Sequence, residues 1–199
     1  MLLVSDCRIE LRQVAAMVAA MVAGALAIWT ASIPAIAQPI SDPATGFAIT
    51  PPPGYGAQPS TAAGNYTAAF EVRKPDDKDT GCRIGFLHIP EKAHFTQAEL
   101  NGYAAKPEWA NEIRTAFSRL YDIISLDRFE HAGVLGSVVV ADRKMPPGAP
   151  PRAGEIRAWL VVQETPKGRT SMACIADKPS FEVRRSEFVA VARGVTLPK

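Results

Sequence analysis

The chain has 199 residues, of which 47% are hydrophobic, and its 22 Lys and Arg residues nearly balance 20 Asp and Glu residues. This composition excludes a chain that is disordered throughout, because such chains combine high net charge with few apolar residues. The net charge of +2 also argues against a protein that binds nucleic acid through a basic surface. At about 100–200 residues per domain, we expect one domain.

The N-terminal segment 1–37 has the three-part pattern of a secretory signal peptide. Arg8 and Arg12 precede an uncharged apolar stretch that ends at Ala35-Ile36-Ala37. Small residues at this point fit the pocket of a signal peptidase, so we expect cleavage before Gln38 and a location in the periplasm or outside the cell. The alternative is an uncleaved membrane anchor, since the apolar stretch is long enough to span a bilayer. Only in that case do we expect contact with a membrane.

Two cysteines, Cys82 and Cys174, remain once Cys7 is removed with the signal. Exported proteins meet an oxidising environment in which two thiols tend to pair, so we predict a Cys82–Cys174 disulfide. The alternative is two separate buried thiols, because free cysteine packs like a small apolar residue. The chain has no Cys-x-x-Cys motif, and neither of these cysteines has a histidine at ligand spacing. We therefore expect no metal site.

The first part of the expected mature chain is rich in proline and glycine. We expect residues 38–64 to form a tether that leads into a first strand at 47–50, which three consecutive prolines end. Residues 65–199 are expected to form a single globular domain. Its first two strands, 66–73 and 82–89, are predicted to form an antiparallel hairpin around a polar loop.

Two helices are predicted next. Thr96 and Glu99 have the spacing of a capping box, in which each side chain bonds a free backbone N–H, and this predicts a helix over 98–104. Pro107 suits the first turn of a second helix. Spacings of four, four and three place its apolar residues on one face. These residues are Trp109, Ile113, Phe117 and Leu120.

The second half is predicted to be mostly strands. Residues 134–141 are nearly all apolar, as expected of a strand buried on both faces. A proline-rich loop at 145–154 is followed by the strongest hairpin signal, the turn 165–169. A helix over 180–193 then ends before Gly194. The expected strands of this half are 123–131, 134–141, 156–164, 170–176 and a short one at 195–197.

Clustered hairpins with two helical regions indicate an α+β fold with a mainly antiparallel sheet. A central strand that is apolar on both faces requires cover on both faces, and the helical regions are the available cover. We therefore expect a helix–sheet–helix sandwich.

The pattern resembles a known group of proteins. Its features are Gly46-Phe47-Ala48-Ile49-Thr50-Pro51, Pro53-Gly54-Tyr55, a turn over 133–136, and Val195-Thr196-Leu197-Pro198 after the last helix. In order and pattern this is similar to small secreted bacterial proteins of unknown function with the α/β/α sandwich of PsbP. The resemblance implies a binding or assembly accessory and no catalytic residues. Fold-level likeness does not itself supply a function.

The chain lacks a recognisable catalytic motif, nucleotide-binding loop or metal-binding spacing. We expect no catalytic residues and no cofactor. A dispersed enzyme site that uses His88, His94 and His131 is the alternative. Asp76, Asp77 and Asp79 fail the calcium-loop pattern at its fifth and sixth positions and are expected to be solvated turn residues.

A basic partner surface is the remaining candidate site. The last helix carries Arg184, Arg185 and Arg193, which together with Lys167 and Arg169 are able to attract an acidic partner. The alternative is an ordinary solvated helix face, since Glu182 and Glu187 dilute the charge.

From these observations we predict an exported, non-catalytic accessory or binding domain. Its partner is expected to be an envelope protein or a small ligand, and not nucleic acid. The alternatives are an enzyme with a dispersed site and a membrane-anchored structural protein of the envelope.

Overall fold

The computed structural model describes residues 38–61 and 64–199. The expected signal segment 1–37, together with Cys7, lies outside the described residues. Within the part of the chain that is described, no helix has the length and apolar character needed to cross a membrane.

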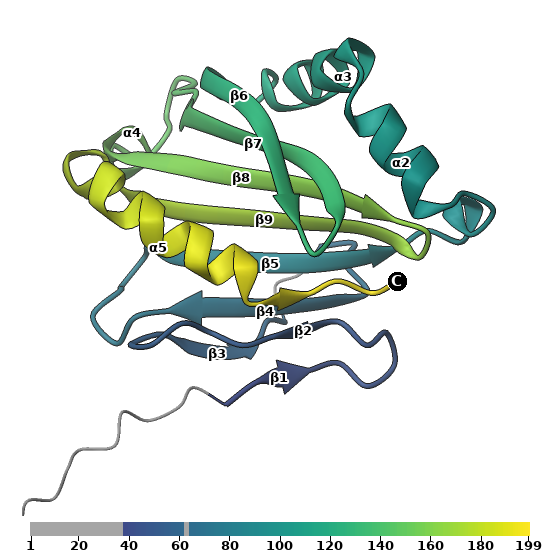
Figure 1. The fold of residues 1–199 in the computed structure, drawn as a ribbon. Helices are drawn as coiled ribbons and strands as arrows, with labels where there is room; N and C mark the ends of the chain where they lie inside the picture. The colour runs from purple at the N-terminus through teal and green to yellow at the C-terminus, as the bar shows by residue number, and fades with distance from the viewer. Residues whose placement is uncertain (1–37, 62–63) are drawn as a thin grey trace, which may run out of the picture. The chain divides into compact units, whose positions relative to one another are not determined.

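A seven-stranded sheet in which every neighbouring pair is antiparallel dominates the structure (Figure 1). Its strand order is β3-β4-β5-β9-β8-β7-β6. The predicted hairpins are confirmed, and the 165–169 turn joins β8 to β9. In chain order the strands are β3 (Gly56–Pro59), β4 (Ala68–Arg73), β5 (Gly81–His88), β6 (Tyr121–His131), β7 (Val134–Arg143), β8 (Ile156–Thr165) and β9 (Gly168–Asp177).

A second, three-stranded sheet joins the two ends of the described chain. It contains β1 (Ile40–Ser41), β2 (Ala48–Ile49) and β10 (Val195–Thr196), in the order β1-β2-β10. Phe47 and Ile49 are completely buried. Tyr55 of the same segment is also part of the core. The segment 38–64, expected to be a tether with one strand, thus contributes three strands and these core side chains. The expected start of the globular domain at residue 65 is therefore too late.

Four α-helices occur in the described residues: α2 (Gln97–Ala104), α3 (Pro107–Phe117), α4 (Arg152–Glu155) and α5 (Phe181–Arg193). The Thr96–Glu99 capping box is confirmed, with both of its hydrogen bonds formed. Two short 3₁₀ turns, η1 (Pro90–Lys92) and η2 (Lys178–Ser180), precede α2 and α5. α4 overlaps the segment predicted to be a loop, and its N-cap residue Pro151 already has helical backbone angles, φ −51° and ψ −38°. α3 ends before Leu120, which is 63% exposed and does not join the predicted apolar face.

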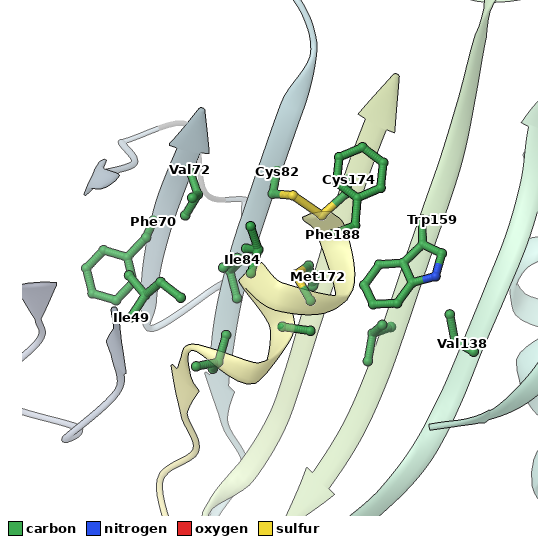
Figure 2. Packing of buried hydrophobic residues seen from close by; sticks show 14 of the residues in the cluster. Ile49, Phe70, Val72, Cys82, Ile84, Val138, Trp159, Met172, Cys174 and Phe188 are labelled. Atoms are coloured by element: carbon green, nitrogen blue, oxygen red, sulfur yellow. A yellow bond between two sulfur atoms is a disulfide. The ribbon is translucent and has the colours of Figure 1, made fainter. Parts of the chain in front are cut away.

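Side chains of the sheet alternate between two hydrophobic clusters. The first cluster joins α5 and the N-terminal strands to one set of alternate residues, such as Val138 and Trp159 (Figure 2). The second cluster joins Trp109 and Ile113 of α3 to the other set, such as Val139 and Leu160. β7 therefore buries apolar side chains in both clusters, as its sequence predicts. The chain is an α+β protein with a large antiparallel sheet.

The predicted disulfide is present and lies inside the first cluster. Cys82 of β5 stands directly opposite Cys174 of β9 in the strand register, and their sulfur atoms are bonded (Figure 2). The bond joins two central strands that are 92 positions apart in the sequence.

Candidate functional site

Helices α2 and α3 leave part of the sheet open. They pack against β6, β7 and β8, at one side of the sheet. On β9 the residues that face this side include Ser171 and Ala173, whose side chains are small and half-buried. Because α3 stops short of these residues, the sheet face over β5 and β9 is hollowed rather than covered.

Two hollows adjoin on this face. The first has a volume of about 340 Å³, and Arg73, Arg83 and Arg143 contribute to its lining. The second, of about 380 Å³, lies between α3 and the sheet, with Ile113, Phe117 and Leu160 in its lining. Arg83, Tyr121 and Ala173 line both. We call the two together the arginine groove. Each hollow lies in the size range of small-molecule sites.

Four arginines line the arginine groove, and strand alternation explains why they meet. The first hydrophobic cluster contains Val72, Cys82 and Met172, and the second contains Ala141. Successive side chains on a strand point to opposite faces, so these residues fix the direction of the arginines near them. This alternation places all four arginines on the face that α3 covers in part. They are Arg73, Arg83, Arg143 and Arg169.

The positive charge of the groove is only partly neutralised. Glu71 bonds both Arg73 (3.1 Å) and Arg83 (3.0 Å). The hydrogen bond from Arg83 is the largest influence on the pKa of Glu71 and lowers it, so this carboxylate stays ionised. Asp79 is held by two hydrogen bonds from Arg152, of 2.7 and 2.9 Å. Arg143 is exposed and forms no ion pair with any of the described residues.

The floor of the groove is apolar, and its backbone is already paired. Ala158, Leu160, Ala173 and Ile175 lie on β8 and β9, which are interior strands with a neighbour on each side. Their N–H and C=O groups are therefore committed to the sheet. The groove thus offers apolar contact below and cationic side chains above. Arginine is well suited to carboxylate and phosphate groups, because its planar guanidinium donates two parallel hydrogen bonds.

The five residues of the expected basic surface do not gather in one place. Arg184 belongs to α5, only 15% of its side chain is exposed, and it is ion-paired to Asp77. Arg169 lines the arginine groove and bonds Glu164 at 2.7 Å. Arg185, Arg193 and Lys167 are exposed, and Arg185 pairs loosely with Glu182 at 3.7 Å.

The three histidines also lie apart. His88 Nδ1 is 2.9 Å from the Lys167 carbonyl oxygen, and His131 Nε2 is 2.8 Å from the Val195 carbonyl oxygen. His94 lies against Phe95, with the ring centres 4.1 Å apart. Across residues 38–61 and 64–199, no three His, Cys, Asp or Glu side chains are grouped so that they could hold a metal ion. The structure therefore does not assemble the dispersed histidine site.

No protein-family model and no curated protein sequence matches the chain. Solved structures do match. The solution structure of cyanobacterial PsbP (CyanoP) from Synechocystis sp. PCC 6803 superposes with a TM-score of 0.52, at 14% identity over 83% of this chain and 95% of that chain. The chain has a PsbP-like fold. A crystal structure from Bacteroides thetaiotaomicron matches with a TM-score of 0.42, at 11% identity over 82% of this chain and 49% of that chain. At these identities the PsbP likeness describes the fold and not the function.

Sequence reasoning missed the groove arginines. No motif or charge cluster in the sequence singles out Arg73, Arg83 or Arg143. The sequence does carry a signal for the groove, but only when β4, β5, β7 and β9 are considered together. Side chains alternate between the two faces along each strand, and this places the four arginines and the small residues of β9 on one face.

Proposed function

We propose that the protein is a non-catalytic accessory domain of the cell envelope that binds its ligand in the arginine groove. The observation that carries this proposal is the placement of four arginines around an apolar floor on an incompletely covered sheet face. Field lines from clustered charges raise the local concentration of anions in such a cleft. In this proposal the sheet is the middle layer of a helix–sheet–helix sandwich, and the groove is the gap in one outer layer.

Export is the second part of the proposal. The basic start, the apolar stretch and the small residues before Gln38 support a cleaved signal, and the Cys82–Cys174 bond suits an oxidising compartment. Mass spectrometry of the protein from the periplasm of an expressing bacterium tests this. A chain that begins at Gln38 is expected, whereas an intact N-terminus in a membrane fraction would overturn export by cleavage.

Binding in the groove is tested by thermal unfolding in the presence of a panel of small anionic, neutral and cationic compounds. We expect anionic compounds with apolar parts to raise the melting temperature. The variant Ala173→Leu extends a side chain into the region that both hollows share, so it should abolish the shift while the protein still unfolds cooperatively. A panel in which no compound acts, or in which the shifts survive Ala173→Leu, contradicts a binding role for the groove.

A further inference from the structure

We infer that the ligand is an elongated amphiphile with one anionic head, such as an alkyl or aromatic chain that ends in a carboxylate. This inference rests on the proposed function and names the chemical class that the groove accepts. It follows from the different character of the two ends of the groove.

The head end is the first hollow. Arg143 and Tyr121 stand opposite each other on the neighbouring strands β7 and β6, and both line this hollow. Arg143 has no ion-pair partner among the described residues, whereas Arg73 and Arg83 share the single carboxylate of Glu71. The unpaired Arg143 and the two arginines that share one carboxylate leave an excess of positive charge in this hollow, which suits an anionic head group.

The tail end is the second hollow, between α3 and the sheet. Its lining includes Ile113, Phe117, Leu120 and Leu160. Leu120 is 63% exposed, so it leaves apolar surface in water at the mouth of this hollow. An apolar chain placed there removes that surface from water, which is favourable at roughly 25 cal/mol per Å². The two hollows share Arg83, Tyr121 and Ala173 in their lining, so one ligand is able to place its head in the first hollow and its tail in the second.

The floor of the groove favours an amphiphile over a peptide, because the backbone groups of the floor are already paired. A peptide carries an N–H and a C=O at every residue, and burying these groups without partners is costly. The strands beneath the groove are interior, so their own backbone groups are not free to pair with a peptide. A hydrocarbon chain has no such groups and needs only apolar contact.

Decanoate is a suitable probe when kept below the concentration at which it forms micelles. Calorimetric titration should detect binding of decanoate to the protein, much weaker binding of acetate, which lacks the tail, and much weaker binding of decyltrimethylammonium, which reverses the charge. Arg143→Gln should weaken decanoate binding about tenfold, the loss expected from one charge-assisted contact at an exposed site. The matched control Arg185→Gln removes the same charge from α5, on the other side of the sheet, and should leave the affinity unchanged.

The outcomes separate this inference from the proposed function. The inference of an anionic amphiphile is overturned if decanoate binds no more tightly than decyltrimethylammonium, or if Arg143→Gln does not change the affinity for decanoate. If an acidic peptide or a short anion binds instead and Ala173→Leu abolishes that binding, the groove remains the binding site but its ligand is not an amphiphile. If nothing that binds responds to Ala173→Leu, both proposals fail. Melting curves of each variant, measured without ligand, show whether a loss of binding is only a loss of folding.

Discussion

Arg184 and Asp77 form a two-point ion pair although 107 positions separate them in the sequence. The two terminal nitrogens of Arg184 donate to the two carboxylate oxygens of Asp77 at 2.8 and 2.9 Å. Asp77 also accepts hydrogen bonds from the Lys74 amide and the Thr80 hydroxyl. Arg184 further donates to the Tyr55 hydroxyl at 3.2 Å. This pair fastens α5 to the turn between β4 and β5, where the sequence indicates only solvated turn residues.

Removing Arg184 should therefore destabilise the protein strongly. The side chains of Arg184 and Asp77 are only 15% and 5% exposed, and loss of one partner of a buried pair leaves an uncompensated charge. We expect Arg184→Met to lower the free energy of unfolding by about 3 kcal/mol. The neighbouring control Arg185→Met breaks only an exposed 3.7 Å contact and should cost less than about 0.5 kcal/mol. Guanidinium-induced unfolding compares the two. Equal losses would refute a specific role for the Arg184–Asp77 pair.

The same pair should make stability depend on pH in acid. Burial by itself would raise the pKa of Asp77, but hydrogen bonds from Arg184, the Lys74 amide and Thr80 outweigh it and lower the pKa to about 2. An unfolded aspartate has a pKa of about 3.9. The stabilisation is thus present above about pH 4 and is lost as the pH falls towards 2, with a total of about 2 kcal/mol.

Denaturant unfolding at pH 5 and at pH 2 tests this dependence. Asp77→Asn should lose about 2 kcal/mol less stability over this interval than the unsubstituted protein. Asp122 is an exposed aspartate with only a 4.0 Å contact to Lys144, so Asp122→Asn is the control that removes a carboxylate without removing a close ion pair. Identical pH profiles for Asp77→Asn and the unsubstituted protein would be incompatible with a lowered pKa at Asp77.

The Cys82–Cys174 bond should make a large contribution to stability. It joins residues 92 positions apart, and on the chain-entropy model a cross-link of this span destabilises the unfolded chain by about 4–5 kcal/mol. We expect the double variant Cys82→Ala/Cys174→Ala to lose about this amount in urea unfolding, with a midpoint close to that of the reduced protein. Peptide mapping without reductant should recover the two cysteines in one linked fragment. Their recovery as two alkylated thiols would refute the bond.

Local patterns predicted most of the large sheet correctly. Period-two alternation marks β4 to within a few residues, the turn at 165–169 marks the hairpin of β8 and β9, and the Thr96–Glu99 box marks the start of α2. In the small sheet, the predicted strands 47–50 and 195–197 correspond to β2 and β10, but β1 and the pairing of the three strands were not predicted. Ile49 of β2 pairs with Val195 of β10, at the other end of the chain, and Phe47 packs on Phe70 and Phe86 of the large sheet. A partner so distant in sequence leaves no local signal.

The arginine groove was inaccessible for a related reason. Arg73 and Arg83 meet because β4 pairs with β5, but Arg143 reaches the same hollow only through the intervening strands β9 and β8. The opening also depends on where α3 ends relative to β9. Neither the order of strands nor the extent of helical cover can be read from a single strand.

The close approach of β7 to β8 at Gly136 offers a final test of the sheet geometry. A Cβ atom added at Gly136 would lie 2.1 Å from the Val162 carbonyl oxygen, a backbone atom that cannot move without separating the strands. We expect Gly136→Ala to cost at least about 2 kcal/mol. Gly102 is the matched control, because it lies in α2 and a Cβ atom there meets nothing within 4 Å. Gly102→Ala should instead stabilise the protein by about 0.5–1 kcal/mol, since alanine loses less backbone freedom than glycine when a helix forms. Chemical unfolding of the two variants should thus shift the midpoint in opposite directions, and a shift of the same sign would contradict the register of β7 against β8.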